Sequence, residues 1–309
     1  MDVDEDRSGE PTAQVDVMAE RGALTNLAYR LLGSLSDAED AVQDAYARWF
    51  ALSAEQQAQI SSPGAWLNTV VTRVCVDVLR SARVRREQYV GEWLPEPLPD
   101  AGEWTKRSTT DSMRDPADWI TLDESVDMAF LVVLDSMTPA ERVSFLLHDV
   151  FRYKFAEVAE IVGRSPGACR QLASNARARI RHSRGEAVPP DRRAAIVSDL
   201  RRAWQAKDVE ALIRLLDPSV SAVADGGGRV PASQVAIVGA PEVAAYLLRV
   251  TEQVPNLELL ERRVNGQPGL VAVAGSELLA VFAYEITGDR VRRVWAIRNP
   301  DKLRSWNRL

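Results

Sequence analysis

The spacing of apolar positions changes along the chain and divides it into helix-forming and sheet-forming parts. Across residues 14–86, and again across 121–184, apolar side chains recur at three- and four-residue intervals, which predicts amphipathic helices. After residue 190, a helical pair over 191–216 precedes glycine-rich loops and alternating runs such as LVAVAG, LLAVFAYEI and RVRRVWAIR. Alternation with β-branched residues predicts strands. The pattern therefore predicts a multidomain chain with two all-α domains followed by an α+β domain.

Two breaks separate these parts. Residues 87–120 lose the helical period and collect Pro, Gly, Asp and Glu, and GEAVPP at 185–190 forms the second break. We expect a disordered N-terminus (1–12), a first helical domain (13–86), an acidic linker (87–120), a second helical domain (121–184), a hinge (185–190) and an α+β domain (191–309).

The first helical domain contains a helix with an acidic face. Ser36 and Glu39 have the spacing of a capping box, so the helix is expected to begin there. At 100° per residue, the apolar positions between Leu35 and Trp49 share one face, and Asp37, Asp40 and Asp44 share the opposite one. That acidic stripe is either a solvated surface or a docking surface for a basic partner.

The next helix combines an apolar stripe with arginines. Ser62 followed by Pro63 is the favoured order at a helix start. Four residues at i,i+4 spacing are expected in the core: Trp66, Val70, Val74 and Val78. Residues 68–86 hold five arginines against one acid, so the polar face suits phosphate contact, with Asn and Thr free to reach base edges. A solvated, arginine-rich helix end is the alternative.

The second helical domain has the layout of a helix-turn-helix. Thr138 and Glu141 form a capping box, a short helix ends at Gly163, and Ser165 caps a helix that runs to about Arg181. Residues 164–184 hold six arginines and no acid in a chain of net charge −6. The second helix would lie in the major groove of DNA. A helical hairpin with an arginine-rich rim is the alternative.

The linker begins with GEWLPEPLPD, in which the prolines exclude a helix. Residues 92–137 hold eleven acids and three bases. Charge and proline alone favour a disordered linker. Trp93 and Leu94 instead indicate that residues 91–97 pack against another part of the chain.

Composition limits the chemistry. The two cysteines and two histidines form no spacing of a disulfide framework, metal site or nucleophile, so we expect no catalytic residue, metal or cofactor. No apolar run approaches the ~20 residues that span a bilayer, and the acidic N-terminus lacks the features of a signal peptide, so a cytoplasmic protein is expected.

Two stretches carry a family resemblance. SDAEDAVQDAYARWF followed by PGAWLNTVVTRVCVDVLR resembles region 2 of extracytoplasmic-function sigma factors, and TPAERVSFLLHDVFRYKFAEVAEIVGRSPGACRQLASNARARI resembles their region 4. The segments WLPEP, ADGGGRV and RNPDKL resemble a SigJ-type subgroup that ends in a SnoaL-like domain. The resemblance implies a promoter-specificity subunit of RNA polymerase with a cone-shaped α+β regulatory domain.

The resemblance also implies partners and site residues. The partners would be promoter DNA and the polymerase core, through its β′ clamp and β flap. Polymerase contact is implied for Asp37, Glu39, Asp40, Gln43 and Asp44. Contact with the minus-10 element is implied for Trp66, Asn68, Thr72, Arg73 and Arg80. Contact with the minus-35 element is implied for Ser165, Arg170, Gln171, Ser174 and Arg177, the last four of which share a sector at helical spacing.

The C-terminal domain is expected to regulate the other two. The family pattern implies that the WLPEP segment docks on two loops of this domain, through Trp93, Leu94, Pro95, Asp225, Gly226, Gly227, Gly228, Asn299, Pro300 and Asp301. Two alternatives stay open: a one-component DNA-binding regulator that senses a small ligand in the C-terminal pocket, and a pocket enzyme with Asp225 as its base. The domain contains no histidine, and fold analogy alone does not establish catalysis.

Overall fold

The computed structural model describes residues 17–86, 89, 91–100, 126–183 and 185–306. The predicted disordered N-terminus and most of the acidic linker lie outside the described residues.

The first helical domain contains a 3-10 turn and four α-helices among its described residues. They are Val17–Glu20, α1 (Arg21–Leu32), α2 (Leu35–Phe50), α3 (Ala54–Ala58) and α4 (Pro63–Arg86). The predicted start of α2 needs correction: its N-cap is Ser34, whose hydroxyl accepts from Asp37 N at 3.2 Å. Gly33 ends α1 with φ 69°, so Ser34 is the only residue between that cap and α2.

The second helical domain has the predicted helix-turn-helix. Its elements are α6 (Met128–Asp135), α7 (Pro139–Phe145), a π-helical turn (Leu146–Val150), α8 (Phe155–Val162) and α9 (Pro166–Ser183). The capping box of Thr138 and Glu141 is confirmed. Gly163 ends α8 with a left-handed backbone, φ 71°, which glycine adopts without strain. The Ser165 hydroxyl then accepts from Ala168 N at 3.2 Å and caps α9.

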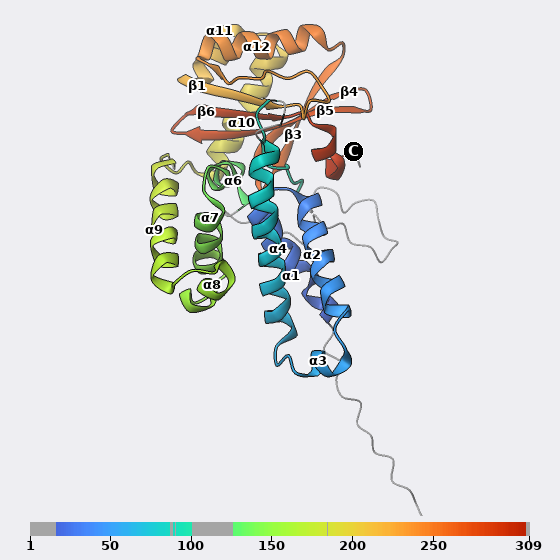
Figure 1. The fold of residues 1–309 in the computed structure, drawn as a ribbon. Coiled ribbons are helices and arrows are strands. Elements are labelled where there is room, and N and C mark those ends of the chain that lie inside the picture. The colour runs from blue at the N-terminus through green and yellow to red at the C-terminus, as the bar shows by residue number, and fades with distance from the viewer. Residues whose placement is uncertain (1–16, 87–88, 90, 101–125, 184, 307–309) are drawn as a thin grey trace, which may run out of the picture.

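The two helical domains pack against each other and share one hydrophobic core. Buried residues from Leu24 in α1 to Ile180 in α9 belong to a single cluster, and α4 contacts both α7 and α8 (Figure 1). Arg142 of α7 reaches across this contact. Its side chain is buried, and its guanidinium donates to Leu31 O at 2.9 Å and to Asp135 Oδ1 at 2.8 Å. The second domain therefore bonds directly to the end of α1.

The C-terminal domain is a six-stranded sheet with three α-helices. Its elements are α10 (Pro190–Gln205), α11 (Val209–Leu215), β1 (Leu216–Asp225), β2 (Ile237–Val238), α12 (Ala240–Gln253), β3 (Leu257–Val264), β4 (Gln267–Ala274), β5 (Glu277–Thr287), β6 (Arg290–Ile297) and two 3-10 turns, Pro300–Lys302 and Arg304–Trp306. The strand order is β2-β1-β6-β5-β4-β3, with β1 and β6 parallel and the other neighbours antiparallel.

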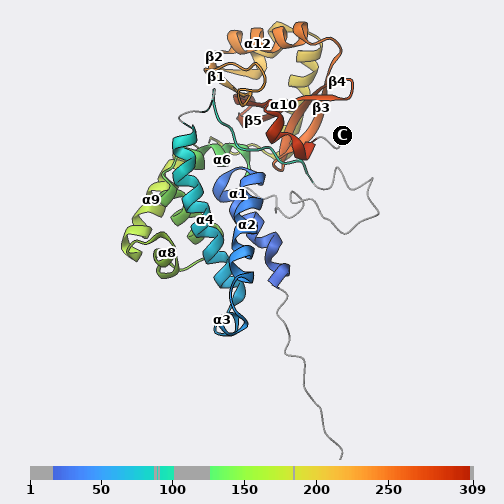
Figure 2. The same ribbon diagram turned by 45° about the vertical axis from the view of Figure 1, so that its right-hand side comes forward.

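The two faces of this sheet bury different partners. One face packs on α10, α11 and α12, where Trp204 lies edge-on to Phe282 at 5.2 Å. The other face forms a second core with parts of the chain outside the sheet: Leu94 of the linker, Met128 of α6, and Leu303 and Trp306 of the C-terminal turns. Figure 2 shows the helical domains on the side of the sheet opposite α12. Residues 94–99 of the linker are therefore enclosed between the sheet and the helices.

Candidate functional site

Residues 94–99, here called the strap, cross between the first helical domain and the C-terminal sheet, and all six are buried. Every second residue is proline, which has no N–H. Each remaining amide has an acceptor: Leu94 N donates to Asp225 Oδ2 at 2.9 Å, Glu96 N to Gly33 O at 2.8 Å, and Leu98 N to Asn265 Oδ1 at 3.0 Å. The strap is thus bonded alternately to the C-terminal domain and to the first helical domain.

Asp225, at the end of β1, holds the first residues of this segment. Its carboxylate is fully buried and accepts from Tyr89 Oη at 2.6 Å and from Lys302 Nζ at 2.7 Å. Lys302 also donates to Leu94 O and lies 4.1 Å from the ring centroid of Trp93. Burial, followed by the bond to Asp225, raises the pKa of Tyr89. Four donors, including Leu94 N, occupy the Asp225 carboxylate, so it is a structural anchor and not an available base.

The loops that surround Asp225 have little free space. Gly227 has φ 62°, and a Cβ placed there would overlap the Asn299 side chain. Asn299 Nδ2 donates to Tyr89 Oη at 3.0 Å, and Asn299 Oδ1 accepts from Asp301 N at 3.0 Å. Asp301 then pairs with Arg229 at 2.8 Å. The structure thus brings together the sequence-predicted residues Trp93, Leu94, Asp225, Gly227 and Asn299, with Pro95, Gly226, Gly228, Pro300 and Asp301 beside them in the same segments.

A second anchor, which the sequence analysis did not identify, holds the other end of the strap. Asn265 is fully buried with φ 52° in the turn between β3 and β4. Its amide nitrogen Nδ2 donates to Tyr29 Oη of α1 at 2.9 Å, and that hydroxyl donates to Glu96 O at 2.8 Å. Trp306 Nε1 donates to Pro97 O at 2.8 Å. Asn-Gly between two alternating runs is a strong hairpin signal, and it could have identified this turn.

Glu96 connects the strap to the start of α2. Its carboxylate Oε2 accepts from Leu35 N at 2.8 Å, within the first turn of α2, where free N–H groups favour an anion. Burial outweighs this attraction and raises the pKa of Glu96 to about 7. The helix with the acidic face therefore begins on a side chain of the strap.

The acidic face of α2 is open to solvent. Asp40 and Gln43 are exposed, and Asp37, Glu39 and Asp44 are partly exposed. Asp44 forms an i,i+4 ion pair with Arg48 at 2.8 Å. The apolar face of α2 is buried in the shared core, so the carboxylates form the outer surface of the helix.

The residues expected to contact the minus-10 element differ in how far their side chains are exposed. Arg73 and Arg80 are exposed. The Thr72 side chain is fully buried, and its hydroxyl donates to Asn68 O at 2.7 Å. Asn68 Nδ2 similarly donates to Gly64 O at 2.8 Å, and half-buried Trp66 lies edge-on to Trp49 at 5.4 Å. Helical spacing places Thr72 on the polar sector, but in the folded chain α4 packs against α1, α2, α7 and α8.

The residues expected to contact the minus-35 element lie along the exposed side of α9. Ser165, Arg170, Gln171 and Ser174 are exposed. Arg177 is half-buried, and its Nε donates to Asp149 Oδ1 at 2.8 Å. Arg170 lies over the ring of Phe155, 5.4 Å from its centroid, and remains exposed, whereas Arg177 is held against the π-helical turn.

Across the described residues, no cluster of His, Cys, Asp and Glu could hold a metal ion. Both cysteines, Cys75 and Cys169, are buried as free thiols. None of the helices within the described ranges has the length and apolar character needed to cross a bilayer.

The chain is similar to known families and proteins over most of its length. Residues 17–85 match the Sigma-70 region 2 family and residues 127–180 match the Sigma-70 region 4 family. The ECF RNA polymerase sigma factor SigJ of Mycobacterium tuberculosis is 36% identical over 295 residues, which cover 92% of this chain and 90% of that protein. SigI of the same species is 33% identical over 287 residues, which cover 92% of each. The crystal structure of M. tuberculosis SigJ superimposes with a TM-score of 0.73 at 33% identity and covers 93% of this chain and 96% of that one.

Proposed function

Because the chain belongs to the ECF RNA polymerase sigma factors, we propose that α2 binds the polymerase core, α4 and α9 read the promoter, and the C-terminal domain controls both through the strap. The chain is a sigma factor with fused helical and α+β parts, and it is not an enzyme. Sigma factor domains bind the polymerase core and promoter DNA. The alternatives of a one-component regulator and of a pocket enzyme are not favoured.

The proposal for polymerase binding rests on the exposed carboxylates of α2. Asp37, Glu39, Asp40 and Asp44, with Gln43, form a polar surface whose charge complements a basic partner, and the β′ clamp is the partner that the family implies. Region 4 would bind the β flap, and the protein would act in the cytoplasm with the polymerase.

The proposal for promoter binding rests on the exposed side of α9 and on the arginines of α4. Arg170, Gln171 and Ser174 would lie in the major groove of the minus-35 element, with Ser165 at the helix start near the backbone. Arg73 and Arg80 would contact phosphates near the minus-10 element.

The packing of the two helical domains indicates a closed state. The minus-10 and minus-35 elements are separated by about 25 base pairs, which is roughly 85 Å of B-form DNA. In contrast, α4 has 24 residues and packs directly on α7 and α8. At about 1.5 Å per residue, α4 is roughly 36 Å long. Promoter binding at both elements therefore requires α4 to separate from α7 and α8 and Arg142 to release Leu31 O.

The C-terminal domain is placed to favour this closed state. The same sheet holds the strap through Asp225 and Asn265 and packs on Met128 of α6. Through Tyr29 it also bonds to α1. The acidic linker joins region 2 (13–86) to region 4 (121–184), and the hinge joins region 4 to a SnoaL-like domain over residues 191–309. By holding the strap, this domain would set the spacing of the two DNA-binding domains.

Run-off transcription with purified core polymerase tests the proposal. The chain should direct initiation from a cognate promoter, and Arg170→Ala should weaken minus-35 recognition by about 1–3 kcal/mol if Arg170 contacts a base. Arg214→Ala, at an exposed arginine of α11, is the matched control and should leave the promoter affinity unchanged. Failure of the wild-type chain to bind core polymerase would refute the proposal.

A further inference from the structure

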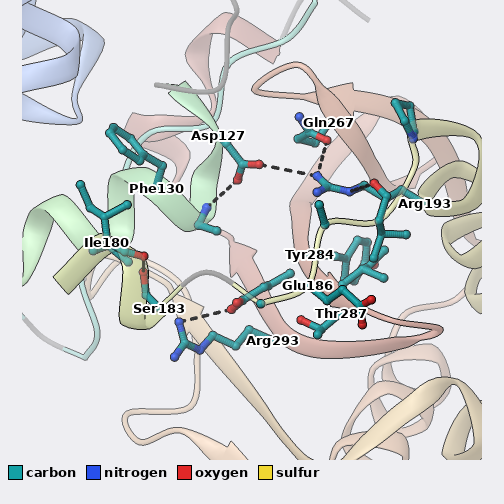
Figure 3. A pocket seen from close by; sticks show the side chains of 18 residues that line it. Asp127, Phe130, Ile180, Ser183, Glu186, Arg193, Gln267, Tyr284, Thr287 and Arg293 are labelled. Atoms are coloured by element: carbon teal, nitrogen blue, oxygen red, sulfur yellow. Dashed lines mark hydrogen bonds and ion pairs between the residues drawn. The ribbon is translucent and has the colours of Figure 1, made fainter. Parts of the chain in front are cut away.

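A cavity of about 350 Å³ lies where region 4 meets the C-terminal domain. Figure 3 shows its lining, with Phe130 and Ile180 on one side and Tyr284, Thr287 and Arg293 on another. Residues 185–190, the hinge between the two domains, contribute Glu186 and neighbouring residues to the wall. The cavity belongs to neither domain alone, and it lies outside the strap, α2 and the exposed side of α9.

The C-terminal wall of the cavity contains buried polar atoms without hydrogen-bond partners in the described structure. Tyr284 is 8% exposed, and its hydroxyl has none. Thr287 Oγ1 and Glu285 Oε2 also have none, although Glu285 Oε2 lies 3.3 Å from the Arg293 guanidinium as an ion pair. A buried polar group without a hydrogen bond costs about 1–3 kcal/mol. Two such atoms on one strand, those of Tyr284 and Thr287, lie in residues that line one cavity and indicate a polar group that is bound there.

Four consecutive residues of β5, Tyr284 to Thr287, line the cavity near the end of the strand. The pairing of β5 with β6 shifts at this point: Glu285 faces Arg293 and Ile286 faces Val291, so the extra residue, Arg292, belongs to β6. Arg293, beside this shift, lines the same wall and pairs with Glu285.

The rest of the lining defines the chemistry of an occupant. Region 4 supplies an apolar wall of Phe130, Val133 and Ile180. The charges largely compensate one another, because Arg193 lies 3.9 Å from Asp127 and Arg293 pairs with Glu285. An ionic ligand would gain little from such a lining. We propose that this cavity binds a small uncharged molecule with a hydroxylated aromatic or alicyclic ring, the ring lying against region 4 and the hydroxyl bonding to Tyr284 or Thr287.

An occupant of this kind would contact both domains at once. It would therefore bind more tightly to the arrangement in which α6 and the end of α9 lie beside the sheet, and it would favour that arrangement. Binding itself does not depend on the proposed promoter function, because it requires only the cavity.

Fluorine NMR on the full-length chain tests the proposal, with 4-fluorophenol as the probe and 4-fluoroanisole as its methylated counterpart. We expect the wild-type chain to broaden the 4-fluorophenol resonance at millimolar concentration and to broaden that of 4-fluoroanisole less, because methylation removes the donor. Tyr284→Phe should weaken 4-fluorophenol binding by about 2- to 10-fold, the effect of one hydrogen bond. Tyr46→Phe, which alters a hydroxyl bonded to Val17 O in region 2, should leave it unchanged.

Two cavity-filling variants complete the design. Val133→Trp enters from region 4 and Thr287→Met from β5, and both should abolish the broadening while circular dichroism shows the wild-type fold. Absence of broadening with the wild-type chain, or equal broadening with whichever filled variant folds, would overturn the proposal. Equal affinity of Tyr284→Phe for the probe would overturn the role of the polar wall. None of these results bears on transcription, since polymerase and promoter are absent from the assay.

Discussion

Replacing Asn265 with glycine removes the side chain that joins the strap to both the C-terminal sheet and α1. Two hydrogen bonds are lost: Leu98 N to Oδ1 at 3.0 Å and Nδ2 to Tyr29 Oη at 2.9 Å. The backbone at this position has φ 52°, which glycine adopts without strain. The substitution therefore isolates the effect of the side chain from that of the turn.

The magnitude follows from the two bonds. Leu98 N is left buried without its acceptor, which costs about 1–3 kcal/mol, and loss of the donor to Tyr29 costs about 0.5–1.5 kcal/mol. The strap should thus open more easily by about 1.5–4.5 kcal/mol. At about 1.4 kcal/mol per factor of ten, the open population should rise roughly 12- to 1,600-fold.

Hydrogen exchange measures this opening directly, because the prolines of the strap have no amide hydrogen. Only Leu94, Glu96 and Leu98 report, and Glu96 N is the informative amide, since its acceptor Gly33 O is not altered by the substitution. Asn256→Gly is the matched control, because Asn256 is exposed and has φ 56°. Glu96 exchange that is as slow in Asn265→Gly as in the control would refute the claim that Asn265 anchors the strap.

Three further changes test other parts of the account. Tyr29→Phe removes a buried hydroxyl that is hydrogen-bonded, so calorimetry should show a lower melting temperature. Tyr284→Phe removes a buried hydroxyl without a hydrogen bond, so its melting temperature should be unchanged or higher. Equal decreases for the two variants would contradict this difference in hydrogen bonding. Because burial raises the pKa of Glu96 from 4.5 to about 7, its contribution to stability is complete below pH 4.5 and is lost as the pH rises through 7. The melting temperature of Glu96→Gln should therefore equal that of the wild type near pH 5 and exceed it near pH 8. Melting temperatures that change with pH by the same amount in both proteins would contradict this prediction. In an anisotropy titration at low salt, Asp40→Lys should weaken binding to core polymerase by roughly tenfold, whereas Glu55→Lys on α3 should leave it unchanged. Equal effects of the two variants would contradict the proposed contact between α2 and the polymerase.

Local patterns predicted the elements that depend on local rules. Proline after a capping residue marked the starts of α4, α7 and α9, and alternation marked β4, β5 and β6. The strands β1 and β3 and the helix α12 were not predicted individually. Part of β1, at Asp217–Ser219, bends away from regular pairing with β6, which weakens its period.

Contacts between distant segments were the part that sequence could not supply. Helical spacing grouped Arg177 with Arg170, but Asp149 of the π-helical turn pairs with Arg177 alone. Thr72 shares a polar sector with Arg73, but its side chain is fully buried in the folded chain. Asn265 and Tyr29 are 236 positions apart, and their bond exists only once the sheet and α1 enclose the strap. Each of these outcomes depends on tertiary packing, which the spacing of apolar residues along the sequence does not predict.

The central claim is that the two DNA-binding domains separate when the chain binds a promoter. Spin labels at Glu55→Cys in α3 and His182→Cys in α9 can report their separation, because both positions are exposed while Cys75 and Cys169 are buried. Double electron–electron resonance should give one defined distance in the free chain and a substantially longer one in the complex with core polymerase and promoter DNA. An unchanged distance in a transcriptionally active complex would contradict the account.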